Sequence, residues 1–122
     1  MQALVIDDSR AMRLILGRML RELSLEVADA DNGRRALDLI DAGLDPALVL
    51  VDWNMPEMTG IEFLTTVRNP PYGSTARILM ITTETDLPQV VQALESGADE
   101  YLMKPFTRES VYAKLQLLGF EV

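Results

Sequence analysis

The chain has 122 residues, enough for one domain with a buried core, and 48% hydrophobic with 25% charged residues is typical of a globular protein. The net charge of −8 argues against nucleic-acid binding, and no apolar run is long enough to span a membrane. Because cysteine and histidine are both absent, the sequence excludes disulfides, thiolate or imidazole metal sites and a Ser-His-Asp triad, and it fits a cytoplasmic protein.

The first elements occupy residues 3–41. Residues 3–6 form a short apolar run that predicts a strand, which ends at Asp7-Asp8. Ser9 can cap a helix over residues 10–23, in which apolar residues recur at helical spacing with arginines mostly opposite. The apolar set is Met12, Ile15, Leu16, Met19, Leu20 and Leu23, and the arginines are Arg13, Arg18 and Arg21. Residues 25–30 predict a second, less buried strand, and residues 34–41 a short helix.

The remaining elements continue the alternation of strand and helix. Residues 47–51 are an uninterrupted Val/Leu-rich run, which indicates a strand buried on both faces of a parallel sheet. Helices are expected at 61–68, at 88–95 and from the cap Thr107 to about residue 118, and strands at 76–81 and 100–103. Five strands alternating with five helices predict a single α/β domain over residues 1–122, with a parallel sheet and right-handed crossovers.

Polar side chains follow four of the five expected strands. They are Asp7 and Asp8 after the first, Asp52 after the third, Thr82 after the fourth and Lys104 after the fifth. A single aspartate at such a place could simply cap a helix or turn, but parallel strands bring all these residues to one edge of the sheet. Three carboxylates would repel one another without a cation, and oxygen ligands favour Mg²⁺. The hydroxyl and the ammonium could then hold an oxyanion such as phosphate.

The residues at these strand ends carry a family resemblance over essentially the whole chain. The motifs are Asp7-Asp8, Asp52-Trp53-Asn54-Met55-Pro56 with Gly60, Leu79-Met80-Ile81-Thr82, and Tyr101-Leu102-Met103-Lys104-Pro105-Phe106. Together they resemble the receiver domains of two-component response regulators, of the stand-alone, CheY-like kind. The resemblance implies a flavodoxin-like, doubly wound (βα)5 fold with a five-stranded parallel sheet of order 2-1-3-4-5.

The resemblance also implies the chemistry. Asp52 would be the phosphorylation site, taking a phosphoryl group from a phosphohistidine of a histidine kinase or histidine phosphotransfer protein. Asp8, Asp52 and the backbone carbonyl of Asn54 would ligate Mg²⁺, or Mn²⁺ in its place, and Asp7 would act through a metal-bound water. Such a protein catalyses its own phosphotransfer and autodephosphorylation without being a turnover enzyme in the usual sense.

Further roles follow from the same resemblance. Lys104, the Thr82 hydroxyl and the Thr83 backbone N–H would bind the phosphoryl oxygens, with the Lys104–Pro105 peptide bond in the cis form. Thr82 and Tyr101 would form the conformational switch.

Two residues are expected to tune dephosphorylation. Asn54 and Glu84 lie two positions after Asp52 and Thr82, where they would flank the path of an attacking water, and they predict fast self-dephosphorylation. The alternative is that both are solvated loop residues without a kinetic role.

The expected output is docking with a downstream target protein, without nucleic acid or membrane, because no output segment follows the last helix. The surface would comprise helix 88–95, strand 100–103 and the helix after Thr107. Val90, Val91, Val111 and Tyr112 are candidates for apolar surface there, and packing of some of them in the core is the alternative.

Two other families share parts of this pattern. A phosphatase of the haloacid dehalogenase class also uses a strand-end aspartate and Mg²⁺, but it expects an acid two residues after the nucleophile, where this chain has Asn54. A flavodoxin-like mononucleotide binder needs a phosphate loop rich in Ser, Thr and Gly after the first strand, where Asp7-Asp8 would instead repel phosphate unless a metal intervened. Mg²⁺-dependent labelling of a colourless protein by acetyl phosphate separates the three.

Overall fold

A five-stranded parallel sheet in the order β2-β1-β3-β4-β5 forms the centre of the computed structural model, which describes residues 1–83 and 87–122. The elements in chain order are β1 (Gln2–Ile6), α1 (Arg10–Glu22), β2 (Glu26–Ala30), α2 (Gly33–Asp41), β3 (Pro46–Asp52), α3 (Gly60–Arg68), β4 (Arg77–Thr82), α4 (Leu87–Glu95), β5 (Glu100–Met103) and α5 (Arg108–Leu117). This order confirms the predicted doubly wound fold. Within the described residues, no helix is both long enough and apolar enough to cross a membrane.

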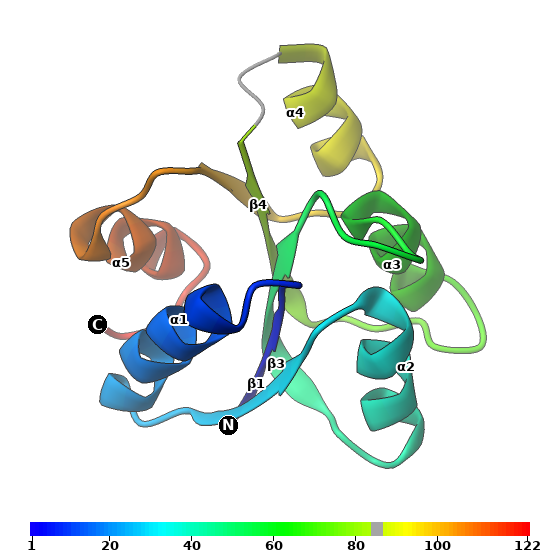
Figure 1. Ribbon diagram of the computed structural model, residues 1–122, viewed down its shortest axis with the longest axis horizontal. Helices are drawn as coiled ribbons and strands as arrows, with labels where there is room; N and C mark the ends of the chain where they lie inside the picture. Colours follow the sequence, from blue (N-terminus) through cyan, green and yellow to red (C-terminus); the bar gives the residue numbers. More distant parts are fainter. Residues whose placement is uncertain (84–86) are drawn as a thin grey trace.

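Helices cover both faces of the sheet. Figure 1 shows α1 and α5 on one side and α2, α3 and α4 on the other. Successive residues of each strand point to opposite layers, so that Leu4 and Ile6 join the core beneath α2 to α4, while Ala3 and Val5 join the core beneath α1 and α5. Burial on both faces explains why the central strands are continuous apolar runs.

Side-chain caps start the helices close to the carboxyl ends of the strands. The Ser9 hydroxyl accepts a hydrogen bond from the Met12 N–H at the start of α1, and Thr107 caps α5, both as the sequence predicts. At α3, Thr59 forms a capping box with Glu62. Each cap thus fixes the residue at which its helix begins.

Some side chains lie on another side of their helix than the sequence pattern suggests. Ile15, counted with the inner face of α1, is 47% exposed, whereas the side chain of Arg13 is only 15% exposed. Of the candidate surface residues, Val90 and Val111 are buried in the core, and Val91 remains 41% exposed. Periodicity gives the phase of an apolar stripe, but the neighbouring elements decide how wide a stripe is covered.

Candidate functional site

The strand register brings four strand ends level with one another. The pairs are Ile6 with Val51, Asp52 with Ile81 and Thr82 with Met103. Asp7, Asp52 and Lys104 therefore meet at one edge, although they are far apart in the sequence. The edge lies where the strand order reverses between β1 and β3, which is the position at which doubly wound sheets bind ligands.

Three aspartates converge at this edge. Asp7, Asp8 and Asp52 each offer a carboxylate oxygen, and these oxygens all lie within 4.8 Å of one another. Asp7 and Asp52 are buried, with 1% and 6% exposure, while Asp8 is exposed. A group of oxygen ligands that is anchored in the sheet and open to solvent on one side suits a hard divalent cation such as Mg²⁺.

Lys104 is the cation that faces these acids. Its Nζ lies 3.3 Å from Asp7 Oδ2 and 3.3 Å from Asp52 Oδ1. The backbone supports this position, because the Lys104 N–H donates to the carbonyl of Thr82 at 2.8 Å. The Lys104–Pro105 peptide bond is cis, as the resemblance predicts.

Burial and the close approach of these charges change the pKa values of both Asp52 and Lys104. Burial, then the negative charge of Asp7, raises the pKa of Asp52 to about 6, against the opposing effect of Lys104. Burial lowers the pKa of the Lys104 ammonium, but the carboxylates of Asp52 and Asp7 outweigh this and raise it overall. Three carboxylates converge here beside the one ammonium of Lys104, so the site can accommodate a further cation.

The loop after Asp52 returns sharply to α3, and Gly60 makes this possible. A Cβ on Gly60 would lie 2.4 Å from the Asp52 carbonyl oxygen, while the Gly60 N–H donates to the Trp53 carbonyl at 3.0 Å. Only a residue without a side chain allows this approach. Met55, which belongs to this loop, is buried in the core.

The other predicted site residues lie around this centre. Thr82 is buried at the end of β4, and Thr83 follows it on the surface. Asn54 is exposed two residues after Asp52, and Glu84 lies outside the described residues. Thr82, Thr83 and Asn54 thus belong to the same edge as the acids and Lys104.

Tyr101 occupies a separate place on β5. Its ring is half-buried, and the Lys114 ammonium of α5 lies 4.6 Å from the ring centroid. The same ammonium lies 3.1 Å from Glu100 Oε1. Lys114 was not among the predicted residues, because nothing in the sequence indicates which residue of the last helix meets β5.

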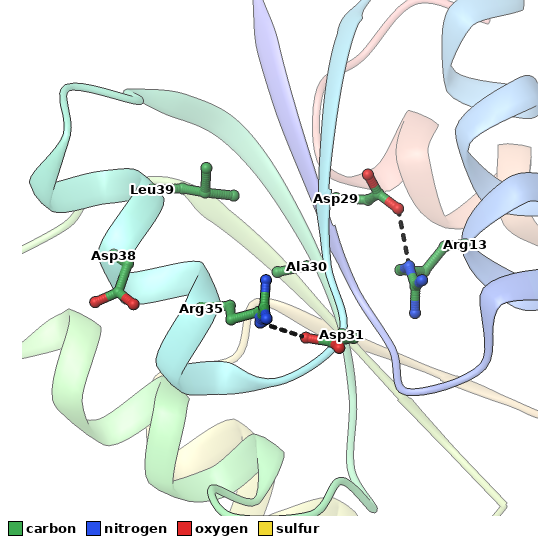
Figure 2. A pocket seen from close by; sticks show the side chains of 7 residues that line it. All are labelled: Arg13, Asp29, Ala30, Asp31, Arg35, Asp38 and Leu39. Atoms are coloured by element: carbon green, nitrogen blue, oxygen red, sulfur yellow. Dashed lines mark hydrogen bonds and ion pairs between the residues drawn. The ribbon is translucent and has the colours of Figure 1, made fainter.

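Arg13 is a second residue that the sequence analysis missed. Its Nη1 donates to the Asp7 carbonyl at 2.8 Å, and its Nε donates to Asp29 Oδ2 at 2.8 Å. Arg13 also lines a pocket between α1 and α2, in which the Arg35–Asp31 ion pair forms the opposite wall (Figure 2). One signal was available, since cations near the start of a helix oppose its dipole and call for local partners.

Comparison with known proteins places this site in a family. Residues 3–116 match the model of the response regulator receiver domain. The chain is 39% identical over 119 residues to chemotaxis protein CheY1 of Helicobacter pylori, covering 97% of this chain and 96% of that protein. It is 38% identical over 117 residues to chemotaxis protein CheY of Pseudomonas aeruginosa, covering 95% and 94%.

Solved structures agree with this result. The chemotaxis response regulator CheY4 of Vibrio cholerae superposes with a TM-score of 0.88 at 34% identity, covering 96% of this chain and 97% of that one. The match of sequence and of fold extends over nearly all of the chain. The chain therefore belongs to the response regulator receiver domains of two-component signalling and is of the CheY type.

Proposed function

We propose that Asp52 accepts a phosphoryl group from a phosphohistidine of a partner kinase or phosphotransfer protein. One observation carries this proposal: the carboxylates of Asp7, Asp8 and Asp52 converge within 4.8 Å beside the Lys104 ammonium. An Asp52 carboxylate oxygen attacks phosphorus, the bond from phosphorus to the histidine nitrogen breaks, and the imidazole of the partner leaves with that electron pair.

The receiver family binds Mg²⁺ at an acidic pocket, and the residues here fit that ion. Asp8, Asp52 and the Asn54 carbonyl would hold it, with Asp7 acting through a bound water, and Mn²⁺ could take its place. The ion supplies charge neutralisation between the acceptor and the incoming phosphoryl group. The raised pKa of Asp52, which comes first from burial and then from the negative charge of Asp7, is consistent with this fit, because a nearby cation would favour the ionised carboxylate.

Lys104 and the threonines of β4 bind the phosphoryl oxygens in this proposal. Lys104 Nζ already contacts Asp52 Oδ1 at 3.3 Å and needs only a short movement to pair with a phosphoryl oxygen on that carboxylate. The Thr82 hydroxyl and the Thr83 N–H complete the set of donors from the next strand end. The chain thus provides alignment and charge, which is most of what phosphoryl transfer requires.

The proposed output is a change of conformation read by a target protein. Thr82 would move toward the phosphoryl group and the Tyr101 ring would turn inward, which shifts the population toward the target-binding state. The surface of α4, β5 and α5 carries exposed apolar side chains suited to docking: Val91, Leu94 and Met103, each 41% exposed.

Asn54 and Glu84 set the lifetime of this state by flanking the path of the attacking water. Exchanging each for another polar residue is expected to change the rate of phosphoryl loss. An unchanged lifetime would instead support the interpretation of both as solvated loop residues.

Membership of the receiver family decides against the phosphatase and mononucleotide-binding alternatives. The decisive experiment is labelling by radioactive acetyl phosphate with and without Mg²⁺. The wild type should be labelled only with Mg²⁺, and Asp52→Asn should remain unlabelled. Asp45→Asn is the matched control, because Asp45 is an exposed aspartate that precedes β3 at the opposite edge of the sheet. Labelling of Asp52→Asn at the wild-type stoichiometry, or labelling without Mg²⁺, would overturn the proposal.

A further inference from the structure

Arg13 links the acidic edge to the neighbouring strand. Its side chain leaves α1 and inserts between the Asp7 carbonyl at the end of β1 and the Asp29 carboxylate in β2, with both hydrogen bonds at 2.8 Å. Figure 2 shows Arg13 and Asp29 facing each other across the gap between α1 and β2. The exposure of the two side chains differs, at 15% for Arg13 and 54% for Asp29. Arg13 is therefore held close to the protein, while Asp29 remains hydrated.

The contact with Arg13 completes the set of partners of Asp7. The Asp7 N–H donates to the Ala30 carbonyl at 3.1 Å, Oδ1 accepts from the Ser9 N–H at 2.8 Å, and Oδ2 lies 3.3 Å from Lys104 Nζ. The carbonyl oxygen is the remaining polar atom, and Arg13 binds it. Each polar group of Asp7 thus has a partner that fixes the turn from which Asp8 also projects.

We propose that Arg13 is a positioning residue for the Mg²⁺ site, which ties the Asp7 carbonyl to Asp29 and so holds the Asp7–Asp8 turn in the arrangement that binds the ion. This inference rests on the Mg²⁺ site of the proposed function. Arg13 touches the backbone of Asp7 and not its carboxylate, so its role is to orient the ligands. Residues that orient metal ligands in this way typically change metal affinity about 10–100-fold when they are removed.

Three roles of Arg13 predict three different results. If Arg13 acted mainly through its charge, removing this cation would make the site more negative, and Mg²⁺ would bind more tightly. If Arg13 only clamped α1 to β2, the free energy of unfolding would fall and the Mg²⁺ affinity of the folded protein would stay the same. A positioning role predicts weaker Mg²⁺ binding. The sign of the change therefore separates them.

The test compares Arg13→Met with Arg35→Met. Arg35 lines the same pocket, but it belongs to α2 and pairs with Asp31 at 3.3 Å, so it serves as a matched control. Mg²⁺ titrations can be followed by the fluorescence of Trp53, the single tryptophan, which directly follows Asp52. We expect Arg13→Met to weaken Mg²⁺ binding about 10-fold and Arg35→Met to leave it unchanged.

Arg13→Lys is the second variant, which keeps the charge but cannot reach both oxygens with a planar fork. It should weaken Mg²⁺ binding as well, by up to about 10-fold, and it covers the case in which Arg13→Met does not fold. A readout without metal complements the titrations: hydrogen exchange of the Ser9 amide, which donates to Asp7 Oδ1, should become faster in both Arg13 variants and not in Arg35→Met.

The outcomes distinguish the two levels of the proposal. If wild-type protein fails to bind Mg²⁺, the proposed function is wrong, and this inference falls with it. If the wild type binds Mg²⁺ but Arg13→Lys and any folded Arg13→Met bind it equally well or more tightly, the inference alone is wrong. Weaker binding with faster exchange at Ser9 supports it.

Discussion

The two edges of the sheet differ in how completely their charged side chains are paired. At the carboxyl edge, Asp7 and Asp52 share Lys104, and the pKa of Asp52 rises to about 6 because burial and neighbouring negative charge disfavour its ionised form. At the amino edge, Arg68 at the end of α3 is paired with Asp99 at 2.9 Å, and their side chains are 18% and 26% exposed. Both regions pair acids with bases, but Asp7 and Asp52 are buried whereas Asp99 is exposed.

The difference lies in how completely the partners are supplied. The Arg68 guanidinium donates to the carbonyls of Gly97, Ser74 and Ala76 as well as to Asp99, at distances between 2.6 and 3.0 Å. Asp99 Oδ2 also accepts the Ile78 N–H at 2.8 Å. This network joins α3, β4 and the α4–β5 connection, and each of its charged groups has an oppositely charged partner. The acidic edge instead keeps negative charge, which weakens the fold locally and prepares it to bind a cation.

Arg68→Met should have the largest effect on stability. The substitution would remove the donor of the Gly97, Ser74 and Ala76 carbonyls, while Asp99 keeps the Ile78 N–H. At roughly 1 kcal/mol for each lost hydrogen bond, we expect a loss of about 3 kcal/mol in the free energy of unfolding. Urea unfolding measures this loss. Arg77→Met is the control, since Arg77 meets Asp99 only at 3.5 Å with a 58% exposed side chain, and should cost less than about 0.5 kcal/mol. An equal loss of stability in both variants would contradict the view that the hydrogen bonds of Arg68 hold this edge together.

Mg²⁺ should stabilise the protein through the acidic edge alone. At an Mg²⁺ concentration 100 times the dissociation constant, binding to the folded state adds about 2.7 kcal/mol to the free energy of unfolding. Arg68→Met should gain the same increment, because its defect lies at the other edge, whereas Asp52→Asn should gain less. Urea unfolding with Mg²⁺ and with EDTA gives these increments. A reduced gain in Arg68→Met would show that the two edges are coupled.

The contrast between the edges also explains what the sequence could predict. Asp7, Asp52 and Lys104 follow apolar strands, and parallel topology alone brings strand ends together, so the acidic edge was predictable. The network around Arg68 was not, because its partners are mainly backbone carbonyls, which every residue possesses. The contact of Arg13 with the Asp7 carbonyl was hidden for the same reason.

The sequence also could not predict the exposure of residues that neighbouring elements cover or leave open. Ile15 fits the apolar period of α1 but lies at the margin of the covered stripe, and Val111 is fully buried where α5 meets the sheet. A helical pattern contains no information about the angle at which the helix crosses the sheet.

Asp52→Asn should stabilise the metal-free protein at neutral pH. Because the pKa of Asp52 is raised to about 6 in the folded state, folding favours its protonated form, and wild-type stability falls as the pH rises from about 4 to 6. Asparagine avoids this loss. We expect Asp52→Asn to be more stable by about 1–2 kcal/mol at pH 7.5 in EDTA, allowing for screening by solvent on the open side, and equal to the wild type near pH 4.

Urea unfolding across this pH range, with EDTA throughout, provides the measurement. Asp45→Asn, at the opposite edge, should follow the wild-type curve. A less stable Asp52→Asn at pH 7.5 would mean that Lys104 already balances the acids, and the contrast between the edges would disappear.

Lys114→Met should have the smallest effect on the free energy of unfolding. It tests whether Tyr101 of the proposed switch is held weakly, by a partly compensated charge, or firmly, by packing. Lys114 Nζ contacts both the Tyr101 ring and Glu100, on side chains that are only partly covered, so the loss of stability should stay below about 1 kcal/mol. The contact favours the ring position seen here, since an inward turn would move the ring away from the ammonium. Its loss should therefore shift the population of the ring about twofold toward the phosphorylated arrangement, if the contact contributes about 0.4 kcal/mol.

Ring NMR signals of Tyr101 measure this population, with beryllofluoride-treated protein as the reference for the phosphorylated arrangement. Lys114→Arg keeps a cation near the ring and should behave as the wild type. A shift of the Tyr101 signals in Lys114→Met would mean that the two ring positions differ little in free energy and that the contact with Lys114 favours one of them. The modest energy of a new phosphoryl contact would then be enough to change the ring position. If the Tyr101 signals do not move, the ring is fixed by its packing, as Arg68 is fixed by its hydrogen bonds.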